Sequence, residues 1–196
     1  MERIADRILW EVDVPLLISL NTGLVSFVLD WVMLILSDKI TWFFVLLAVM
    51  LWHIWRQRWE QLKVFGLIFL AVIIADAFAY QVLKPFFDRL RPCKEYYFVR
   101  TVLSCGGNHS FPSNHATNFM LLCVLVMKYC QVKWGVLAFI LTIGVGMSRV
   151  YLGVHYPTDI LAGFVVGGIF GMLSSLIYDV YLGRYLFSGR ASKGGG

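Results

Sequence analysis

Charged residues are scarce in this sequence, since Asp, Glu, Lys and Arg make up 15% of its 196 residues while 59% are hydrophobic. A soluble globular domain contains about 25% charged residues, because its surface must interact with water. The mean hydropathy of +0.74 therefore excludes an ordinary soluble domain and indicates a membrane protein. At roughly 20 residues per crossing, the length allows one domain with five or six helical spans.

The sequence also lacks a concentrated basic patch, although its net charge is +5. Its Lys and Arg residues lie beside hydrophobic segments, which excludes nucleic acid as a partner. The four cysteines include no CxxC pair, which argues against a zinc framework. Acidic residues interrupt the N-terminal segment, so we do not interpret it as a signal peptide.

Five hydrophobic blocks are long enough to span a bilayer, and they comprise residues 40–56, 62–83, 115–131, 134–152 and 156–182. A sixth block, residues 12–37, contains Pro15 and Asp30, so we expect a weaker span preceded by an interfacial helix. The pattern predicts an all-α, integral membrane six-helix bundle formed by one domain over residues 1–187. Residues 188–196 resemble a flexible tail whose final glycines are typical of a cloning remnant.

The distribution of basic residues over alternate loops predicts the orientation. With six spans, the N-terminus, residues 56–63, residues 128–133 and the C-terminus share one basic side, which the positive-inside rule places in the cytoplasm. Loops 84–114 and 148–156 then face the periplasm or exterior of a bacterial cytoplasmic membrane. These loops contain six basic residues themselves, so the rule holds only if several of the six belong to a functional site.

The cysteines fall into two pairs. Cys93 and Cys105 lie in the long loop that we expect outside the cytoplasm, where the compartment permits disulfides, so we predict a bond between them. Cys123 and Cys130 fall within a predicted span, where we expect buried thiols.

Polar residues concentrate in three segments on the predicted outer side, namely Lys84–Pro92, Phe111–His115 and Ser148–Asp159. Together these segments bring cationic, hydroxyl, imidazole and carboxyl groups to one rim of a very apolar chain. Ionisable residues at membrane depth usually mark function. The clustering therefore predicts a site for an anionic group.

The residue types suit phosphoryl transfer, in which the phosphate oxygens must be neutralised while the attacking and leaving atoms lie in line. Arg91 and Arg149 can each bind two oxygens, and Lys84 adds a point charge. Ser113 and Ser148 can add hydrogen bonds, together with the backbone N–H groups at the start of the following span.

His155 and Asp159 are four residues apart, so on a helix they share a face. The carboxylate can then hold one ring nitrogen protonated and leave the other free to attack phosphorus. With His115 also present, one histidine can serve as nucleophile and the other as acid to the departing oxygen.

Several of these residues have simpler roles open to them. We interpret Arg89 as a snorkelling residue at a helix end. Ser113 can act as a helix cap and Ser148 can bond to its own helix backbone. Asp76, on the same helical face as Lys84, is expected to pair with a basic group across the bundle. Haem ligation by the two histidines is disfavoured, because the surrounding cations select for an anion.

Three motifs occur in sequence order: KxxxxxxRP at Lys84–Pro92, PSxH at Pro112–His115 and SRxxxxxHxxxD at Ser148–Asp159. Together they resemble the type 2 phosphatidic acid phosphatase family, and the flanking helices match its six-helix plan. The family usually has glycine where this chain has Asn114.

The resemblance implies a metal-independent membrane hydrolase that uses no cofactor and forms a phosphohistidine intermediate. By this resemblance His155 is the nucleophile, Asp159 orients it and His115 is the general acid. The implied phosphate-binding residues are Lys84, Arg91, Ser113, Asn114, Ser148 and Arg149.

A membrane-embedded site points to a lipid-linked phosphate or pyrophosphate as substrate, surrounded by membrane lipids. Undecaprenyl pyrophosphate and lipid A 1-phosphate are favoured, followed by phosphatidylglycerol phosphate and phosphatidic acid. One alternative is a phosphotransferase that passes the phosphoryl group from His155 to a second lipid. Another is a non-catalytic channel, transporter or receptor for anionic headgroups, which leaves the spacing of His155 and Asp159 unexplained. The sequence does not set the oligomeric state.

Overall fold

The computed structural model describes residues 4–180, with side chains described from Trp10 onward, and it is helical with no strand in that part of the chain. The helices in chain order are α1 (Ile4–Asn21), α2 (Phe27–Ser37), α3 (Lys39–Trp55), α4 (Trp59–Phe78), the π-helix η1 (Ala79–Leu83), α5 (Lys84–Phe87), α6 (Pro92–Glu95), α7 (Asn114–Tyr129), α8 (Val132–Tyr151) and α9 (Pro157–Tyr178). The all-α prediction is therefore confirmed. The predicted tail, residues 188–196, lies outside the described residues.

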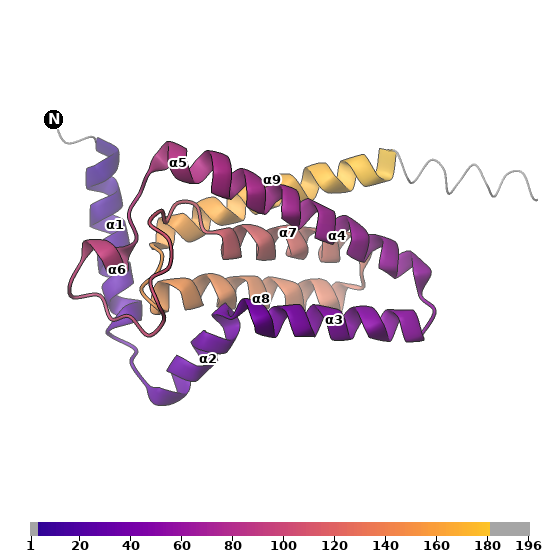
Figure 1. The fold of residues 1–196 in the computed structure, drawn as a ribbon, viewed down its shortest axis with the longest axis horizontal. Helices are drawn as coiled ribbons and strands as arrows, with labels where there is room; N and C mark the ends of the chain where they lie inside the picture. The colour runs from indigo at the N-terminus through magenta and orange to yellow at the C-terminus, as the bar shows by residue number, and fades with distance from the viewer. Residues whose placement is uncertain (1–3, 181–196) are drawn as a thin grey trace, which may run out of the picture.

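Helices α3, α4, α7, α8 and α9 run along the long axis of the molecule and form a bundle (Figure 1). Three continuous helical segments are long and apolar enough to cross a membrane: Trp59–Phe87, Val132–Tyr151 and Pro157–Tyr178. Helices α2 and α3 form a fourth such segment if they are taken together, with a bend of 60° between them. Large apolar side chains cover the outside of the bundle, as expected where a surface contacts lipid. The multi-pass membrane architecture agrees with the prediction.

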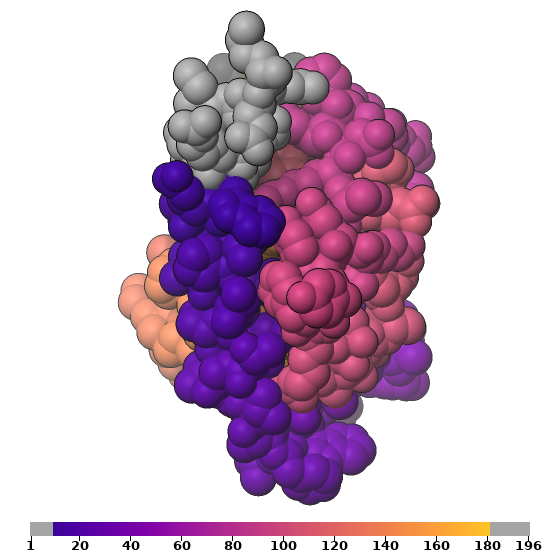
Figure 2. All heavy atoms as spheres, turned by 90° about the vertical axis from the view of Figure 1, so that its left-hand side faces the viewer, coloured from indigo at the N-terminus to yellow at the C-terminus, as the bar shows by residue number. Residues whose placement is uncertain are grey.

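The N-terminal part departs from the expected sixth span. Residues 12–37 are divided between α1 and α2, and α1 lies across one end of the bundle (Figures 1 and 2). The polar residues Asp13 and Asn21 are buried within the protein, which holds α1 against that end. The six-span count is therefore not confirmed. The expected placement of the N-terminal segment at the opposite end is wrong for Arg7, because Arg7 lies on α1, whereas Arg3 is outside the described residues.

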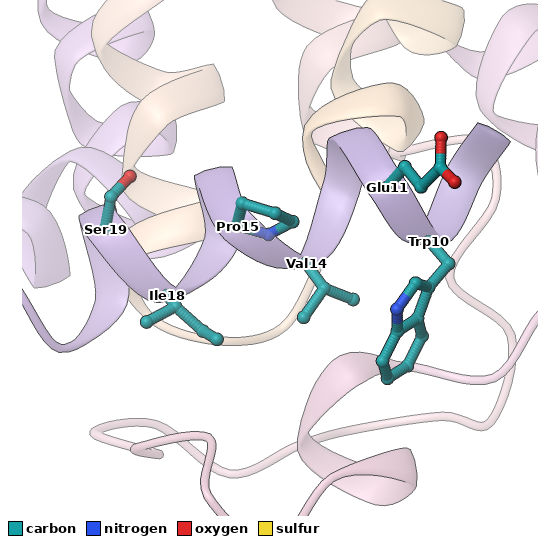
Figure 3. Close-up of a pocket in the computed structure, with 6 residues that line it drawn as sticks. All are labelled: Trp10, Glu11, Val14, Pro15, Ile18 and Ser19. Carbon is teal, nitrogen blue, oxygen red and sulfur yellow. The ribbon is translucent and has the colours of Figure 1, made fainter. Parts of the chain in front are cut away.

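A shallow groove follows the outer side of α1 (Figure 3). Its lining residues are Trp10, Glu11, Val14, Pro15, Ile18 and Ser19. The Trp10 ring meets Tyr96 edge to face, with a centroid separation of 5.4 Å, so α1 also packs against the loop that carries α6. None of the described residues that line this groove belongs to the predicted site.

Helices α7 and α9 approach closely at glycine positions, as their small-xxx-small spacing predicts. A Cβ atom added to Gly167 would lie 2.1 Å from the carbonyl oxygen of Thr117, and one added to Gly163 would lie 2.7 Å from the Ala116 Cβ. A Cβ at Gly171 would also fall within 2.9 Å of a neighbouring side chain. The close contact matters for function because both helices begin at the predicted site.

Gly167→Ala is expected to lower the free energy of unfolding by about 1–3 kcal/mol, since the added methyl group forces the two helices apart. Gly168→Ala is the matched control, because its Cβ would come no closer than 4.0 Å to another group. That variant should equal or exceed the wild type in stability, because alanine favours a helix over glycine. Thermal unfolding in detergent micelles measures both. A Gly167→Ala protein as stable as Gly168→Ala would contradict this packing.

The loop between α5 and α7 is fastened to the turn that follows α8. Gly153 in this turn has a φ of +73°, and a Cβ there would lie 2.6 Å from a Val99 methyl group. The Gly153 carbonyl accepts a hydrogen bond from the Cys93 N–H at 3.1 Å. Glycine is therefore required here both for the left-handed backbone and for the close approach of the loop.

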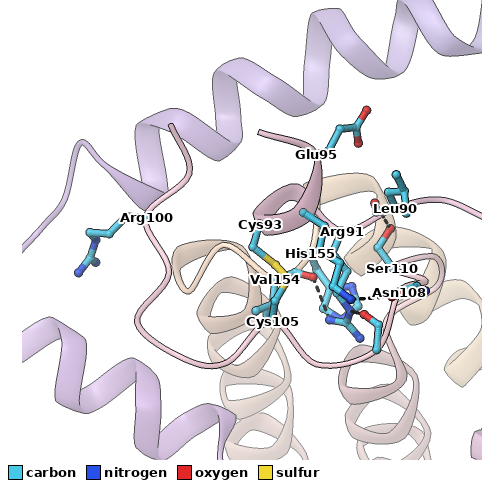
Figure 4. Close-up of a disulfide and its surroundings, with 12 residues drawn as sticks. Leu90, Arg91, Cys93, Glu95, Arg100, Cys105, Asn108, Ser110, Val154 and His155 are labelled. Carbon is cyan, nitrogen blue, oxygen red and sulfur yellow. Dashed lines mark hydrogen bonds between the residues drawn. A yellow bond between two sulfur atoms is a disulfide. The ribbon is translucent and has the colours of Figure 1, made fainter. Parts of the chain in front are cut away.

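A disulfide joins Cys93 and Cys105, whose Cα atoms are 6.1 Å apart, as predicted. Figure 4 shows it beside Arg91 and His155. Closing a loop of this length restricts the unfolded chain and contributes on the order of 2–3 kcal/mol. The prediction for the other pair is only half right. Cys123 is buried, but Cys130 is exposed because α7 ends at the residue before it.

Candidate active site

The three predicted polar segments meet at the end of the bundle where α7 and α9 begin and α8 ends (Figure 1). The Ser113 N–H donates to the Asp159 carbonyl at 3.0 Å, which joins the first turns of α7 and α9. Lys84 lies at the start of α5 and reaches the same end. The predicted clustering of the three segments is thus present in the structure.

His155 is held by the start of α9. Its Nδ1 lies 3.3 Å from Asp159 Oδ2, and the same oxygen accepts the Tyr156 N–H at 2.9 Å. Asp159 therefore caps its own helix and orients the imidazole at the same time. Both side chains are buried, with 2% of His155 and none of Asp159 exposed. Contact with a carboxylate places the proton on Nδ1 and leaves the lone pair on Nε2.

Arg91 lies next to that second ring nitrogen. Its Nη1 is 3.3 Å from His155 Nε2 and donates to the Val154 carbonyl at 3.0 Å (Figure 4). Its Nε donates to the Gly107 carbonyl at 2.8 Å. The guanidinium is therefore anchored to the backbone beside the atom that would attack a phosphate.

The electrostatic environment keeps His155 neutral. Burial lowers the pKa of its imidazole well below the ordinary value, and the positive charges of Arg149, Arg91 and Lys84 lower the pKa further. A neutral imidazole has a free lone pair, which a nucleophile requires. The same cations provide a positive environment for a phosphate group.

Arg149 and His115 share an anchor that the sequence analysis missed. Arg149 Nη1 donates to the hydroxyl of Ser37, and His115 Nε2 lies 3.1 Å from the Ser37 carbonyl. Ser37 is buried at the break between α2 and α3. The buried Nε of Arg149 has no partner among the described residues. A buried donor without an acceptor is costly, so this N–H is well suited to bind an anion.

Lys84 holds the loop that precedes α7. Its Nζ donates to the carbonyls of Pro112 at 2.9 Å and of His109 and Ser110 at 3.3 Å each. These contacts occupy the three donors of the ammonium group. Lys84 therefore fixes the backbone of the segment that precedes Ser113, and it adds a positive charge to the site.

Ser113 acts as a helix cap, and Ser148 bonds to the backbone of its own helix. The Ser113 hydroxyl caps α7 by accepting the Ala116 N–H at 3.5 Å, and the Ser148 hydroxyl donates to the Val145 carbonyl at 2.7 Å. Both side chains are fully buried at the site. The free first-turn N–H groups of α7 still form the anion-binding arrangement of a helix N-terminus.

We expected Asp76 to pair with a basic group, but among the described residues it pairs with two amides instead. Its Oδ1 accepts amide N–H groups from Asn114 at 2.8 Å and from Asn118 at 3.0 Å. The two amides lie one helical turn apart on α7, which packs against α4 and so brings them to the carboxylate. The side chain of Asn114 is therefore directed to Asp76, and its backbone N–H is the group available to a phosphate.

The interpretation of Arg89 as a snorkelling residue is wrong. Its guanidinium bridges two buried carboxylates, with 3.0 Å from Nη1 to Asp159 Oδ1 and 2.6 Å from Nη2 to Asp13 Oδ2. The signal that the sequence offered was Asp13, an acidic residue that lies between Val12 and Val14 of α1. Its partner is far away in the chain, so no local pattern connects the two.

Comparison with known proteins decides the family. Residues 65–181 match the model of the PAP2 superfamily, and this range contains all three motifs. The chain belongs to the PAP2 superfamily. Asp13 and Ser37 lie before the matched range.

Two curated PAP2-like relatives and a solved structure illustrate the similarity. A lipid A 4'-phosphatase of Porphyromonas gingivalis is 33% identical over 183 residues, which cover 88% of this chain and 74% of the relative. A provisionally named undecaprenyl-diphosphatase of Escherichia coli is 33% identical over 145 residues, with 72% and 69% covered. The crystal structure of LpxE from Aquifex aeolicus superposes with a TM-score of 0.68 at 20% identity, over 83% of this chain and 94% of that one. At that identity the superposition shows a shared fold.

Proposed function

We propose that this PAP2-superfamily chain is a membrane phosphatase that removes phosphate from a phosphorylated lipid through a phosphohistidine at Nε2 of His155. The observation that carries the proposal is the buried imidazole held between Asp159 at Nδ1 and Arg91 at Nε2. This arrangement fixes the ring, keeps it neutral and places a cation beside the attacking nitrogen. A non-catalytic headgroup receptor would need the cations but not the oriented histidine.

The reaction has two displacements. In the first, Nε2 of His155 attacks phosphorus, the bond from phosphorus to the lipid oxygen breaks, and the imidazolium form of His115 gives that oxygen a proton. Burial and the nearby cations lower the pKa of His115, so this form depends on the negative charge of the bound phosphate. In the second, water attacks the phosphohistidine, His115 takes the water proton, and the phosphorus–nitrogen bond breaks to release inorganic phosphate. Asp159 stabilises the positive charge that the ring acquires in the first step. Each role belongs to a protein side chain, so the reaction needs no metal ion.

The phosphate is bound by the charged and hydrogen-bonding groups around His155. We assign this role to Lys84, Arg91, Ser113, Asn114, Ser148 and Arg149. Arg149 contributes its unpartnered Nε, and Ser113 and Asn114 contribute through the N-terminus of α7. The Ser148 hydroxyl must turn from the Val145 carbonyl to reach the phosphate.

Among lipid phosphates, we propose the 1- or 4'-phosphate of lipid A as substrate, with undecaprenyl pyrophosphate as the second candidate. The relative that is matched over 88% of this chain carries a lipid A phosphatase name, which supports this order. A rim site also suits a substrate whose acyl chains remain in the bilayer while its phosphate enters the protein.

The test is release of inorganic phosphate from lipid A, undecaprenyl pyrophosphate, phosphatidylglycerol phosphate and phosphatidic acid, each in the presence of a chelator. We expect lipid A to give the highest kcat/KM, with no loss of rate from the chelator. Transfer of label to a second lipid without release of phosphate would instead establish a phosphotransferase. Loss of all activity with the chelator would contradict the mechanism.

We propose that the chain lies in a bacterial cytoplasmic membrane with the His155 end facing the periplasm or exterior. The disulfide at this end suits an oxidising compartment. The turn between α3 and α4 at the other end carries Arg56 and Arg58, as a cytoplasmic loop should.

Cysteine labelling tests this orientation. In a Cys130→Ser background, which removes the exposed native thiol, a cysteine at Asn108 should react with a membrane-impermeant maleimide in intact cells. A cysteine at Gln57 should react only after the membrane is opened. The reverse pattern would overturn the proposed orientation.

A further inference from the structure

Arg89 lies between two carboxylates that are fully buried. Its Nη1 donates to Asp159 Oδ1 at 3.0 Å and to Thr158 Oγ1 at 2.8 Å, and its Nη2 donates to Asp13 Oδ2 at 2.6 Å. The guanidinium also lies over the Tyr156 ring, with Cζ 3.8 Å from the centroid. The Arg89 side chain is 18% exposed. It thus supplies the counter-charge that two buried acids require.

The two oxygens of Asp159 have different partners. Oδ2 contacts His155 Nδ1 and accepts the Tyr156 N–H, while Oδ1 contacts Arg89. A carboxylate held on both oxygens cannot rotate without breaking a charged hydrogen bond. The contact with Arg89 therefore determines which oxygen faces the imidazole.

Asp13 fixes the other side of Arg89 and the start of α9. Its Oδ1 accepts the Thr158 N–H at 2.9 Å, and its Oδ2 accepts the Thr158 hydroxyl at 2.5 Å. The first N–H groups of a helix have no partner within it, so a carboxylate there is favourable. Through these contacts α1, which covers part of this end of the molecule in Figure 2, reaches Thr158, the residue next to Asp159.

The geometry separates Arg89 from the phosphate-binding arginines. Both of its terminal nitrogens already donate to side chains of α1 and α9. The buried Nε of Arg149, in contrast, has no partner among the described residues. Arg89 is therefore placed to act on Asp159 rather than on the substrate.

From these contacts we propose that Asp13 and Arg89 are positioning residues of the reaction. Asp13 holds Arg89 and the first turn of α9, and Arg89 holds Asp159 so that its Oδ2 meets Nδ1 of His155. The inference rests on the proposed role of His155 as nucleophile. It makes α1 a part of the active-site framework, although α1 lies before the range that matches the superfamily model.

Asp13→Asn and Arg89→Gln are expected to lower kcat about 10- to 100-fold, by analogy with the loss of outer-shell residues that orient metal-ligating histidines. KM should stay within about 2-fold, because the phosphate-binding groups remain in place. Arg89→Lys keeps the charge but not the two-sided contact, so its kcat should be intermediate. A rise in KM with unchanged kcat would mean that Arg89 binds the phosphate and would overturn the proposal.

A mutant cycle tests whether Arg89 acts through Asp159. In an Asp159→Asn background, adding Arg89→Gln should lower kcat by less than about 3-fold further, since coupled residues are not additive. If the two substitutions lower kcat by fully additive amounts of free energy, Arg89 does not act through Asp159 and the proposal is contradicted. If Asp13→Asn does not fold, the Arg89→Lys and Arg89→Gln variants still decide the question.

The matched control is Asp30→Asn, which breaks a second Arg–Asp pair near the same end. Arg100 Nη2 lies 2.8 Å from Asp30 Oδ1, and the two side chains are 27% and 24% exposed. This variant should keep kcat within about 2-fold of the wild type, as expected for a site away from the reacting groups. A loss equal to that of Asp13→Asn would indicate general loosening and overturn the inference.

His155→Ala separates this inference from the proposed function. If His155→Ala keeps full activity, the proposed function itself fails. If His155→Ala is inactive while Asp13→Asn and Arg89→Gln keep the wild-type kcat, the nucleophile stands and only the positioning role is wrong.

Discussion

His155→Ala is expected to lower kcat by more than about 10³-fold, because the variant has no group that can accept the phosphoryl group. Binding of the lipid phosphate should stay within a few fold, since Arg91 and Arg149 remain to neutralise the phosphate. Steady-state phosphate release gives kcat, and equilibrium binding of a lipid phosphate to the detergent-solubilised protein gives the affinity.

His53→Ala is the control for replacing a histidine. His53 lies near the end of α3, with its Nδ1 bonded to the Val49 carbonyl at 2.8 Å, and α3 ends at the opposite end of the bundle. The kcat of this variant should equal that of the wild type. Equal activity of His155→Ala and His53→Ala would show that His155 is not the nucleophile.

His115→Ala is expected to give a loss that depends on the leaving group. General acid catalysis contributes about 10²–10⁴-fold when a strongly basic oxygen departs. The Ser37 carbonyl holds Nε2 of His115. In the proposed reaction the transferred proton is therefore assigned to the other ring nitrogen, Nδ1. With a lipid phosphomonoester, kcat/KM should fall by this factor.

A nitrophenyl phosphate needs little protonation of its departing oxygen, so the same variant should lose less than about 10-fold with that substrate. Ser113→Ala offers a comparison, because a phosphate-binding residue should affect both substrates alike. An equal loss for the two substrates in His115→Ala would assign His115 to phosphate binding instead of acid catalysis.

Hydropathy was sufficient to predict the long helices from residue 40 onward, because apolar side chains that face lipid must form long continuous runs. The predicted span 115–131 is not confirmed, since α7 is not among the described helices that are long and apolar enough to cross a membrane. The blocks 40–56 and 134–152 agree with α3 and α8 to within two residues. The polar segments were also predictable as one cluster. Their order in the chain, combined with alternating spans, brings them to the same end of the bundle.

The N-terminal arrangement was not predictable in the same way, because its polar residues are satisfied by distant partners. Asn21 donates to the carbonyls of Arg100 at 2.8 Å and Tyr151 at 2.7 Å. The break after α2 did have a local signal. Asp38 caps α3 by accepting the Thr41 N–H at 2.8 Å, a spacing that marks a helix start.

The role of the break between α2 and α3 in the site could not be predicted from the sequence, because the partners of Ser37 are also distant in the chain. Ser37 meets Arg149 because α2 and α8 pack together, and its carbonyl also lies beside His115 of α7. Arg89 likewise depends on Asp13, which belongs to another helix. The motifs identify the groups that would touch the substrate, whereas the groups that hold them come from tertiary packing.

The most direct test of the central role of His155 is to trap the intermediate. The protein is mixed with lipid A radiolabelled in its phosphates, quenched within a single turnover and digested, with chelator present throughout. The expected result is an acid-labile, base-stable label on the peptide that contains His155, with none in His155→Ala. Label on another residue, or rapid turnover by the wild type with no labelled protein at any quench time, would contradict the phosphohistidine mechanism.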